Sequence, residues 1–355
     1  MQRGMHHWIA AFGLAVAFTA PVGASELTDS LKKGTPELKS ATALAFGPEG
    51  ILFVGDPQGA AIVAIGTGDT STGGKDPVKV DKLTDKIGGL LGTTGADVTI
   101  NDFKVNPASG NLYFSVSRGK GTTAAPVIVK LDRAGKFTAL ELKDVPFASV
   151  KIPNASEKKR EEAITGLAYA DGKVLVAGLS NEEFASTLRS IPFPFKAADK
   201  GASVEIFHGA HGKLETNSPV RTFTLFDIAG KSNLLAAYTC TPLVRFPLDT
   251  LKPGEKVRGT TIAELGNGNR PLDMIVYQKG GKDYLLLANN KRGVMKIQLE
   301  GIEKIEPITK PAKPMSGTQY ETIATLKDIV QLDKLDAERA VVLNAEGLLD
   351  TVPLP

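Results

Sequence analysis

The chain of 355 residues contains one cysteine, Cys240, and one tryptophan, Trp8. A single cysteine excludes an internal disulfide, a cysteine-ligated iron–sulfur cluster and a C-x-x-C-H haem site. The 42 lysines and arginines nearly balance the 39 aspartates and glutamates, so the composition favours neither nucleic acid nor an anionic membrane as a partner. The sequence also has no G-x-S-x-G elbow, P-loop, H-E-x-x-H or dinucleotide-binding fingerprint. Any hydrolysis would therefore depend on a metal ion or on carboxylates.

Residues 1–24 have the pattern of a secretory signal peptide. Arg3 precedes an apolar run over 8–20, and small residues over 22–24 form a cleavage site. The run is too short and wrongly flanked for a membrane span. We expect cleavage after Ala24, a periplasmic or secreted protein, and one domain over residues 25–355.

A unit of three short strands recurs six times along the remaining chain. In the first copy, apolar strands over 44–46, 51–54 and 61–65 are separated by turns rich in Gly and Pro. A fourth strand fits between copies, over 78–83, 137–142, 203–207, 260–264 and 302–308. The second strands begin near Gly50, Gly110, Gly172, Ser232, Asp283 and Glu338, at steps of 60, 62, 60, 51 and 55 residues. Regularly spaced four-strand units predict an all-β, six-bladed β-propeller.

The sixth copy lacks a fourth strand because the chain ends at Pro355. We therefore expect an N-terminal strand around residues 37–39 to complete the last blade and close the ring, which removes two exposed sheet edges. A β-sandwich array or two domains is the alternative. No composition shift divides the chain, and the linker-like segment Lys310–Pro314 falls within the last inter-blade loop.

Two segments resemble the SMP-30/gluconolactonase family. Residues 101–114, N-D-F-K-V-N-P-A-S-G-N-L-Y-F, resemble its N-D-x-x-x-D-P-x-G-x-L-Y segment, and residues 269–274 resemble its P-D-G segment. The P-x-G-x-L-x-V-x-D pattern over 48–56 is similar to NHL and TolB-like six-bladed propellers. The resemblance implies a six-bladed propeller with lactonase or esterase activity and a divalent-metal site, in which Asp273 matches one ligand.

The sequence departs from that family at two metal-ligand positions. A Glu of the first blade and an Asn of the middle blade are replaced by Thr42-Ala43 and Thr165-Gly166. Since Ca2+ takes about 6 to 8 oxygen ligands, these replacements weaken the expectation of a calcium site. WD-repeat and pyrroloquinoline-quinone propellers are disfavoured because both need tryptophans, and Trp8 lies in the leader.

Polar residues gather where the first strand of each unit begins, and in a propeller these strands line a central channel. Carboxylates placed around one axis repel unless a cation or a proton intervenes. They would either bind a divalent cation such as Ca2+ or be neutralised by arginine or lysine in structural ion pairs. The predicted ligand-binding residues are Asn101, Asp102, Asp273, Asp328 and Arg270, with Asn101, Asp102 and Asp273 as metal ligands; the neutralising cations would be Arg221, Arg270 or Lys327.

Two further pairs are weaker candidates. Asn289 and Asn290 lie in a loop on the face where a ligand would bind, although asparagines also suit turns. His208 and His211, separated by a glycine-containing turn, could bind a transition metal, although loop histidines are commonly exposed turn residues. The sequence thus predicts an exported propeller that binds a partner protein or a polar small ligand on its loop-rich face. The alternative is a metal-dependent lactonase or esterase of the SMP-30 type.

Overall fold

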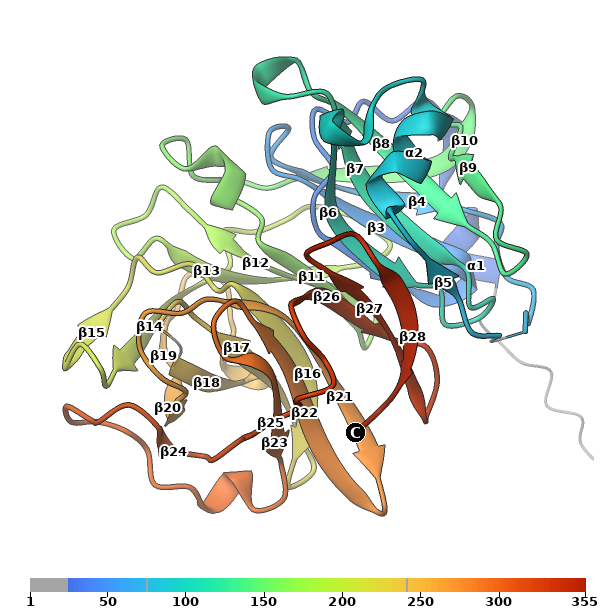
Figure 1. Ribbon diagram of the computed structural model, residues 1–355. Coiled ribbons are helices and arrows are strands. Elements are labelled where there is room, and N and C mark those ends of the chain that lie inside the picture. The colour runs from blue at the N-terminus through green and yellow to red at the C-terminus, as the bar shows by residue number, and fades with distance from the viewer. Residues whose placement is uncertain (1–24, 75, 241) are drawn as a thin grey trace, which may run out of the picture.

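Six sheets, antiparallel except where β19 (Lys256–Arg258) joins β14 (Ala202–His208), surround one central axis, as the computed structural model shows for residues 25–74, 76–240 and 242–355 (Figure 1). The predicted all-β, six-bladed propeller is confirmed. The predicted signal peptide lies outside the described residues. Within the described part of the chain, no helix is both long and apolar enough to cross a membrane.

The inner strand of each sheet faces the central channel. These strands contact one another around the axis rather than pairing by a backbone ladder. They are β2 (Leu44–Phe46), β6 (Val98–Val105), β11 (Gly166–Ala170), β16 (Thr222–Ile228), β21 (Pro271–Lys279) and β26 (Ile329–Lys334).

The second and third strands of each blade match the predicted repeat. Leu285, Leu286 and Leu287 of β22 are all fully buried, because neighbouring blades cover both faces of each sheet. The second strands are β3 (Ile51–Asp56), β7 (Leu112–Arg118), β12 (Lys173–Leu179), β17 (Lys231–Ala237), β22 (Lys282–Asn289) and β27 (Arg339–Asn344). The third strands are β4 (Ala61–Gly66), β8 (Ala125–Leu131), β13 (Ser186–Pro192), β18 (Pro242–Pro247), β23 (Gly293–Gln298) and β28 (Leu349–Pro353).

Three outer strands form where the sequence predicts them, namely β9 (Phe137–Ala139), β14 (Ala202–His208) and β20 (Thr260–Glu264). The predicted strand over 302–308 is wrong. Buried Ile302 instead begins a 3-10 turn, and β25 (Glu321–Thr322) pairs with β23. The rim also carries β15 (Lys213–Glu215), β19 (Lys256–Arg258) and β24 (Ser316–Gly317). The 3-10 turns are η1 (Pro48–Gly50), η2 (Gly95–Asp97), η3 (Gly121–Thr123), η4 (Arg160–Glu162), η5 (Leu248–Thr250) and η6 (Ile302–Lys304).

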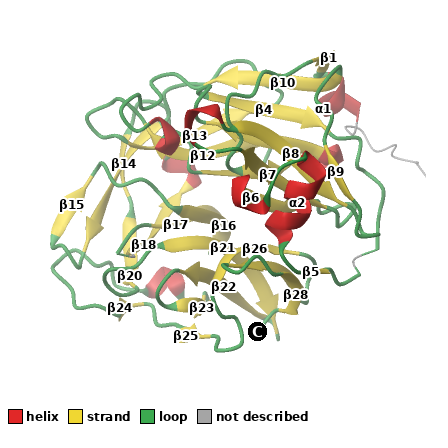
Figure 2. Ribbon diagram, turned by 45° about the horizontal axis from the view of Figure 1, so that its top comes forward, coloured by secondary structure: helices red, strands yellow, loops and turns green. Residues whose placement is uncertain are grey.

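The order of blades around the ring differs from their order in the sequence. Inner-strand contacts run from β2 to β6, β26, β21, β16, β11 and back to β2. The second repeat therefore lies between the first and the sixth. Helix α2 (Leu83–Leu91) packs beside β6 and β9 at this junction (Figure 2).

The ring is closed by a strand from the N-terminal quarter of the chain, but not by residues 37–39. β5 (Lys79–Val80) pairs with β28 of the last blade, so the strand predicted over 78–83 serves the last blade. In the first sheet, β10 (Val145–Lys151) pairs with β4, and β1 (Lys32–Gly34) pairs with β10 at the outer edge. Helix α1 (Ser25–Asp29) comes just before β1 in the chain. The backbone N–H groups of Lys39 and Ser40 donate to the Asp56 carboxylate, which holds this segment against the first blade.

Candidate binding site in the central channel

A cavity of about 550 Å³ occupies the channel and is lined by residues from all six inner strands. Lys104 is one of these lining residues, and its ammonium group lies close to two carboxylates. The Nζ atom is 3.5 Å from Asp102 Oδ1 and 3.8 Å from Asp273 Oδ2. Asp333, which also lines the channel, adds a third negative charge to this group.

The three carboxylates also bind backbone groups of neighbouring blades. Asp102 accepts a hydrogen bond of 2.8 Å from the Leu44 N–H, and Asp273 accepts one of 3.1 Å from the Leu332 N–H. Asp333 accepts one of 2.7 Å from the Val105 N–H. Because inner strands of different blades share no backbone ladder, these bonds connect the blades around the axis. The cluster of Lys104 with its three carboxylates is therefore part of the scaffold.

Burial, together with the neighbouring charges, shifts the pKa values of this cluster. Burial raises the pKa of Asp102 to about 7; nearby Lys104 opposes the shift, and Asp273 and Asp333 add to it. Burial likewise raises the pKa of Asp333. Burial alone would lower the pKa of Lys104, but the three carboxylates raise it above its ordinary value. The ammonium group thus stays charged while one carboxyl retains its proton toward neutral pH.

The structure brings Asp102 and Asp273 together but places Asp328 elsewhere. Three inner strands carry a register shift near their start, and beyond it Asp102, Asp273 and Gln331 occupy corresponding positions. Asp328 lies three residues earlier, on an exposed turn with φ of 54°. Its backbone carbonyl accepts the Ala345 N–H.

Lys104 and Asp333 are the channel residues that the sequence reasoning missed. Lys104 follows Asp102 by two positions on a strand, and Asp333 follows Gln331 by two. Side chains two residues apart on a strand point to the same face, so a period of two counted from Asp102 would have found Lys104. Asp333 could not be found in this way, because the same count from Asp328 reaches Val330 and Leu332.

The donor set around Lys104 does not fit Ca2+. The carboxylates of Asp102 and Asp273 already face an ammonium group and accept backbone hydrogen bonds. Asn101, the third predicted ligand, donates through Nδ2 to Ala41 O and Ser117 Oγ, at 2.8 and 2.9 Å. A dication at this place would meet the positive charge of Lys104 and too few free oxygens.

The mouth of the channel carries two arginines and one glutamate. Arg221 Nη1 lies 2.7 Å from Glu162 Oε1, and Arg221 Nε donates to Thr239 Oγ1. The guanidinium of Arg270, among the described residues, makes no hydrogen bond or ion pair. Burial and the proximity of Arg221 lower the pKa of Arg270, and Glu162 partly offsets this effect. The mouth thus has one more positive than negative charge, and Arg221 pairs with Glu162 rather than with the channel carboxylates.

Asn289 and Asn290 form hydrogen bonds with the loop that carries Arg270. Asn289 donates to Asn269 Oδ1 and accepts the N–H groups of two following residues. Asn290 Oδ1 accepts the Arg270 N–H at 2.7 Å, and the Asn290 N–H donates to the Arg270 carbonyl. These reciprocal bonds fix the backbone that presents Arg270. Lys327, the other predicted cation, is exposed outside the channel lining.

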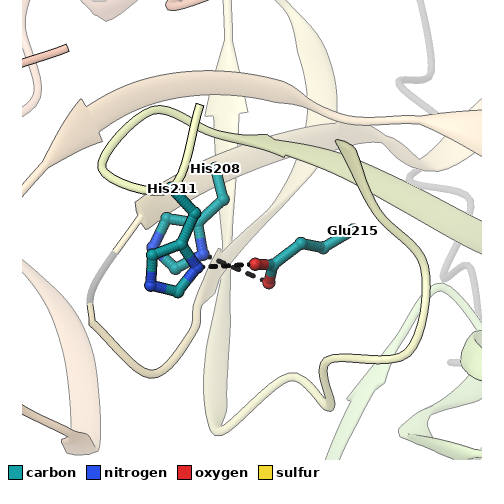
Figure 3. A group of neighbouring side chains, drawn as sticks. All are labelled: His208, His211 and Glu215. Carbon is teal, nitrogen blue, oxygen red and sulfur yellow. Dashed lines mark hydrogen bonds and ion pairs between the residues drawn. The ribbon is translucent and has the colours of Figure 1, made fainter. Parts of the chain in front are cut away.

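His208 and His211 lie together outside the channel, on the β14–β15 hairpin (Figure 3). Their rings are 3.8 Å apart between centroids. The Nδ1 atoms of His208 and His211 lie 3.1 and 2.7 Å from the carboxylate of Glu215, which the sequence reasoning missed. Burial lowers the pKa of His208, whereas hydrogen bonds from His211 and Ser218 outweigh burial and lower that of Glu215 to about 2.

Comparisons with known proteins give fold-level similarity alone. No protein-family model and no curated protein matches the sequence. Among solved structures, a pyrroloquinoline-quinone-bound aldose sugar dehydrogenase from Streptomyces coelicolor is 12% identical with a TM-score of 0.40, and the match covers 90% of this chain and 96% of that one. The extracellular region of plexin A4 is 11% identical with a TM-score of 0.44, covering 92% of this chain but 40% of that one.

A putative glucose dehydrogenase from a Thermus species is 11% identical with a TM-score of 0.37, and the match covers 91% of this chain and 99% of that one. All these similarities are weak, and the propeller assignment rests on the strand pairing. The six-bladed architecture that the resemblance to SMP-30, NHL and TolB-like proteins implied is confirmed, and the matched structures are not specifically members of those families.

Proposed function

We propose that this protein is an exported binding propeller that holds a small anionic ligand at the channel mouth, against Arg221 and Arg270. The observation that carries the proposal is the Arg270 guanidinium, which has no ion-pair partner among the described residues and lies at the opening of a cavity of about 550 Å³. Small-molecule sites commonly have volumes of about 300 to 1,000 Å³. A carboxylate or phosphate group would supply the missing charge in bidentate geometry.

Binding rather than catalysis suits the chemistry of the lining. Within the described part of the chain, the lining residues include threonines but no histidine, cysteine or serine. The carboxylates that a metal-dependent lactonase would use are engaged by Lys104 and by backbone N–H groups. Export remains a proposal based on the signal-peptide pattern of residues 1–24.

The proposal is tested by thermal melting and calorimetry with phosphate, sulfate, citrate and gluconate. Arg270→Ala should weaken binding of the preferred anion about tenfold or more, since hydrogen bonds to charged groups contribute about 1.5 to 3 kcal/mol. The matched control is Arg118→Ala, which removes an exposed arginine outside the channel lining and should leave binding unchanged. A wild-type melting temperature that none of the four anions moves, or equal binding by Arg270→Ala, would overturn the proposal.

A further inference from the structure

The hairpin between β14 and β15 positions three potential metal ligands. Its turn is closed by hydrogen bonds from His211 N to His208 O and from Gly212 N to Gly209 O. The turn brings the two imidazoles close together with their planes tilted by 33°, and Glu215 on β15 reaches toward both from the opposite strand (Figure 3). One ligand atom from each of His208, His211 and Glu215 lies within 4.8 Å of the other two.

A fourth residue, Glu264, lies behind His208 and comes from β20 of the next blade. Its side chain is fully buried, and its Oε2 atom is 4.0 Å from His208 Nε2. Oε1 accepts the Gly209 N–H at 2.6 Å, which fixes the carboxylate against the turn. A Cβ atom at position 209 would lie 2.8 Å from a side-chain atom of Ile308 and 3.1 Å from Glu264 Oε1, so a glycine allows the turn to pack this closely against both residues.

Several polar atoms here are buried without a well-formed hydrogen bond. The side chain of His208 is only 2% exposed. Among the described residues, neither its Nδ1, which faces Glu215, nor its Nε2 makes a hydrogen bond of good geometry. The Oε2 atom of Glu264 also has no such hydrogen bond. Leaving a buried polar group unsatisfied costs about 1 to 3 kcal/mol. His208 Nδ1 is the unsatisfied atom on the side of His211 and Glu215, and a buried polar atom left in this way suggests a ligand that satisfies it.

We propose that His208 Nδ1, His211 Nδ1 and the Glu215 carboxylate bind a divalent first-row transition ion, with Zn2+ as the probe. Two imidazoles and one carboxylate suit Zn2+ and its neighbours, whereas Ca2+ prefers an all-oxygen shell. The side chain of His211 is 44% exposed, so water can complete the coordination from the solvent side.

Glu264 is the positioning residue of this site. When Nδ1 of His208 binds the ion, the proton of the imidazole resides on Nε2, which faces Glu264 Oε2. A histidine ligand usually donates its other N–H to a carboxylate or carbonyl, which fixes its tautomer and ring orientation. The 4.0 Å separation is longer than a hydrogen bond, and we expect it to shorten when the ion binds.

The proposal is tested by titrating the chelator-treated full-length protein with ZnCl2, and separately with CaCl2, in a calorimeter. We expect one equivalent of Zn2+ and no binding of Ca2+ at the same place. His211→Ala should abolish Zn2+ binding. Glu264→Gln, which keeps an oxygen for the Gly209 N–H, should weaken it by about 10- to 100-fold.

The matched control is Cys240→Ser, which removes the one cysteine of the chain, a side chain that also suits Zn2+ but lies outside this cluster. It should bind Zn2+ like the wild type. Circular dichroism and melting of each variant without metal verify that the fold persists. Undiminished Zn2+ binding by His211→Ala, loss of binding in the control, or equal affinities for Zn2+ and Ca2+ would overturn the proposal and leave a hydrogen-bonded His–Glu pair only.

Discussion

Lys104 explains why like charges can converge on the propeller axis. Its side chain retains 21% exposure, and that of Asp102 retains 18%, both toward the channel that they line. One ammonium group cannot balance three carboxylates, so a proton on Asp102 reduces the remaining repulsion. A proton held by the folded state makes stability depend on pH.

We predict that stability decreases as the pH rises from about 4 toward 7. The folded chain keeps the Asp102 proton up to about pH 7, whereas the unfolded chain releases it near the ordinary pKa of 3.8. Unfolding therefore releases a proton in this window, and the free energy of unfolding falls by at most about 1.4 kcal/mol per pH unit. Urea unfolding of the wild type and Asp102→Asn across this range should show a flatter slope for the variant.

Asp171→Asn, on an exposed turn, is the control for that measurement and should keep the wild-type slope. An identical slope for Asp102→Asn would contradict the prediction. A slope that rises with pH in the wild type would show that a group with a lowered pKa in this range, such as His208, dominates instead, because the unfolded chain then binds more protons than the folded one.

The channel residues could be predicted from the sequence only in part. Asp102 and Asp273 were found because each stands next to a recognisable apolar strand. Asp328 was chosen by the same rule, but the apolar run that it precedes begins before the register shift of the last inner strand, whereas Asp102 and Asp273 follow the shifts of theirs. The position that corresponds to them is therefore Gln331. Such a shift depends on pairing with β27 and leaves no periodic signal in the sequence.

At the scale of elements, strand length decides what the sequence can predict. The second strands are long apolar runs, and all six were predicted. β5 has two residues and β1 has three, so whether these segments form strands depends on the sheet edge that each one meets. β10 is long enough to detect, but its pairing with β4, across the whole second repeat, has no local signature.

The attachment of β5 gives an element-scale prediction. The Val78 N–H donates to Thr351 Oγ1 at 2.8 Å, and the Thr351 N–H donates to the Val78 carbonyl at 2.9 Å. Thr351→Val removes the first acceptor while keeping the shape, and should lower the free energy of unfolding by about 1 kcal/mol. Hydrogen exchange should accelerate at Val78.

The control for this change is Thr138→Val on β9, an outer strand where the threonine is exposed. Its effect should stay within about 0.5 kcal/mol. Equal exchange rates at Val78 in wild type and Thr351→Val would show that the backbone bond alone holds the closure.

At the scale of the whole molecule, the ring is closed by segments interleaved between blades. The chain builds the first blade, adds β5 to the last one, builds the second blade, and returns through β10 to the first. Three blades thus depend on residues 79–151. The sequence indicates six units, but sequence spacing carries no information about their spatial order, because that order is set by which sheet edges the connecting segments join.

This topology predicts that the two ends of the described chain differ in importance. Removing residues 349–355 deletes β28, which lies between β27 and β5, together with buried Leu349 and Leu354. Two sheet edges are then exposed, and cooperative thermal unfolding should be lost.

Removing residues 25–36 from a chain that starts at Ser25 deletes only α1 and the edge strand β1. Because Leu31 is the main apolar side chain lost, the free energy of unfolding should fall by about 2 kcal/mol with cooperativity intact. Calorimetric melting of both truncated chains checks the contrast, and a reversed order of stability would show that β1 rather than β5 secures the ring.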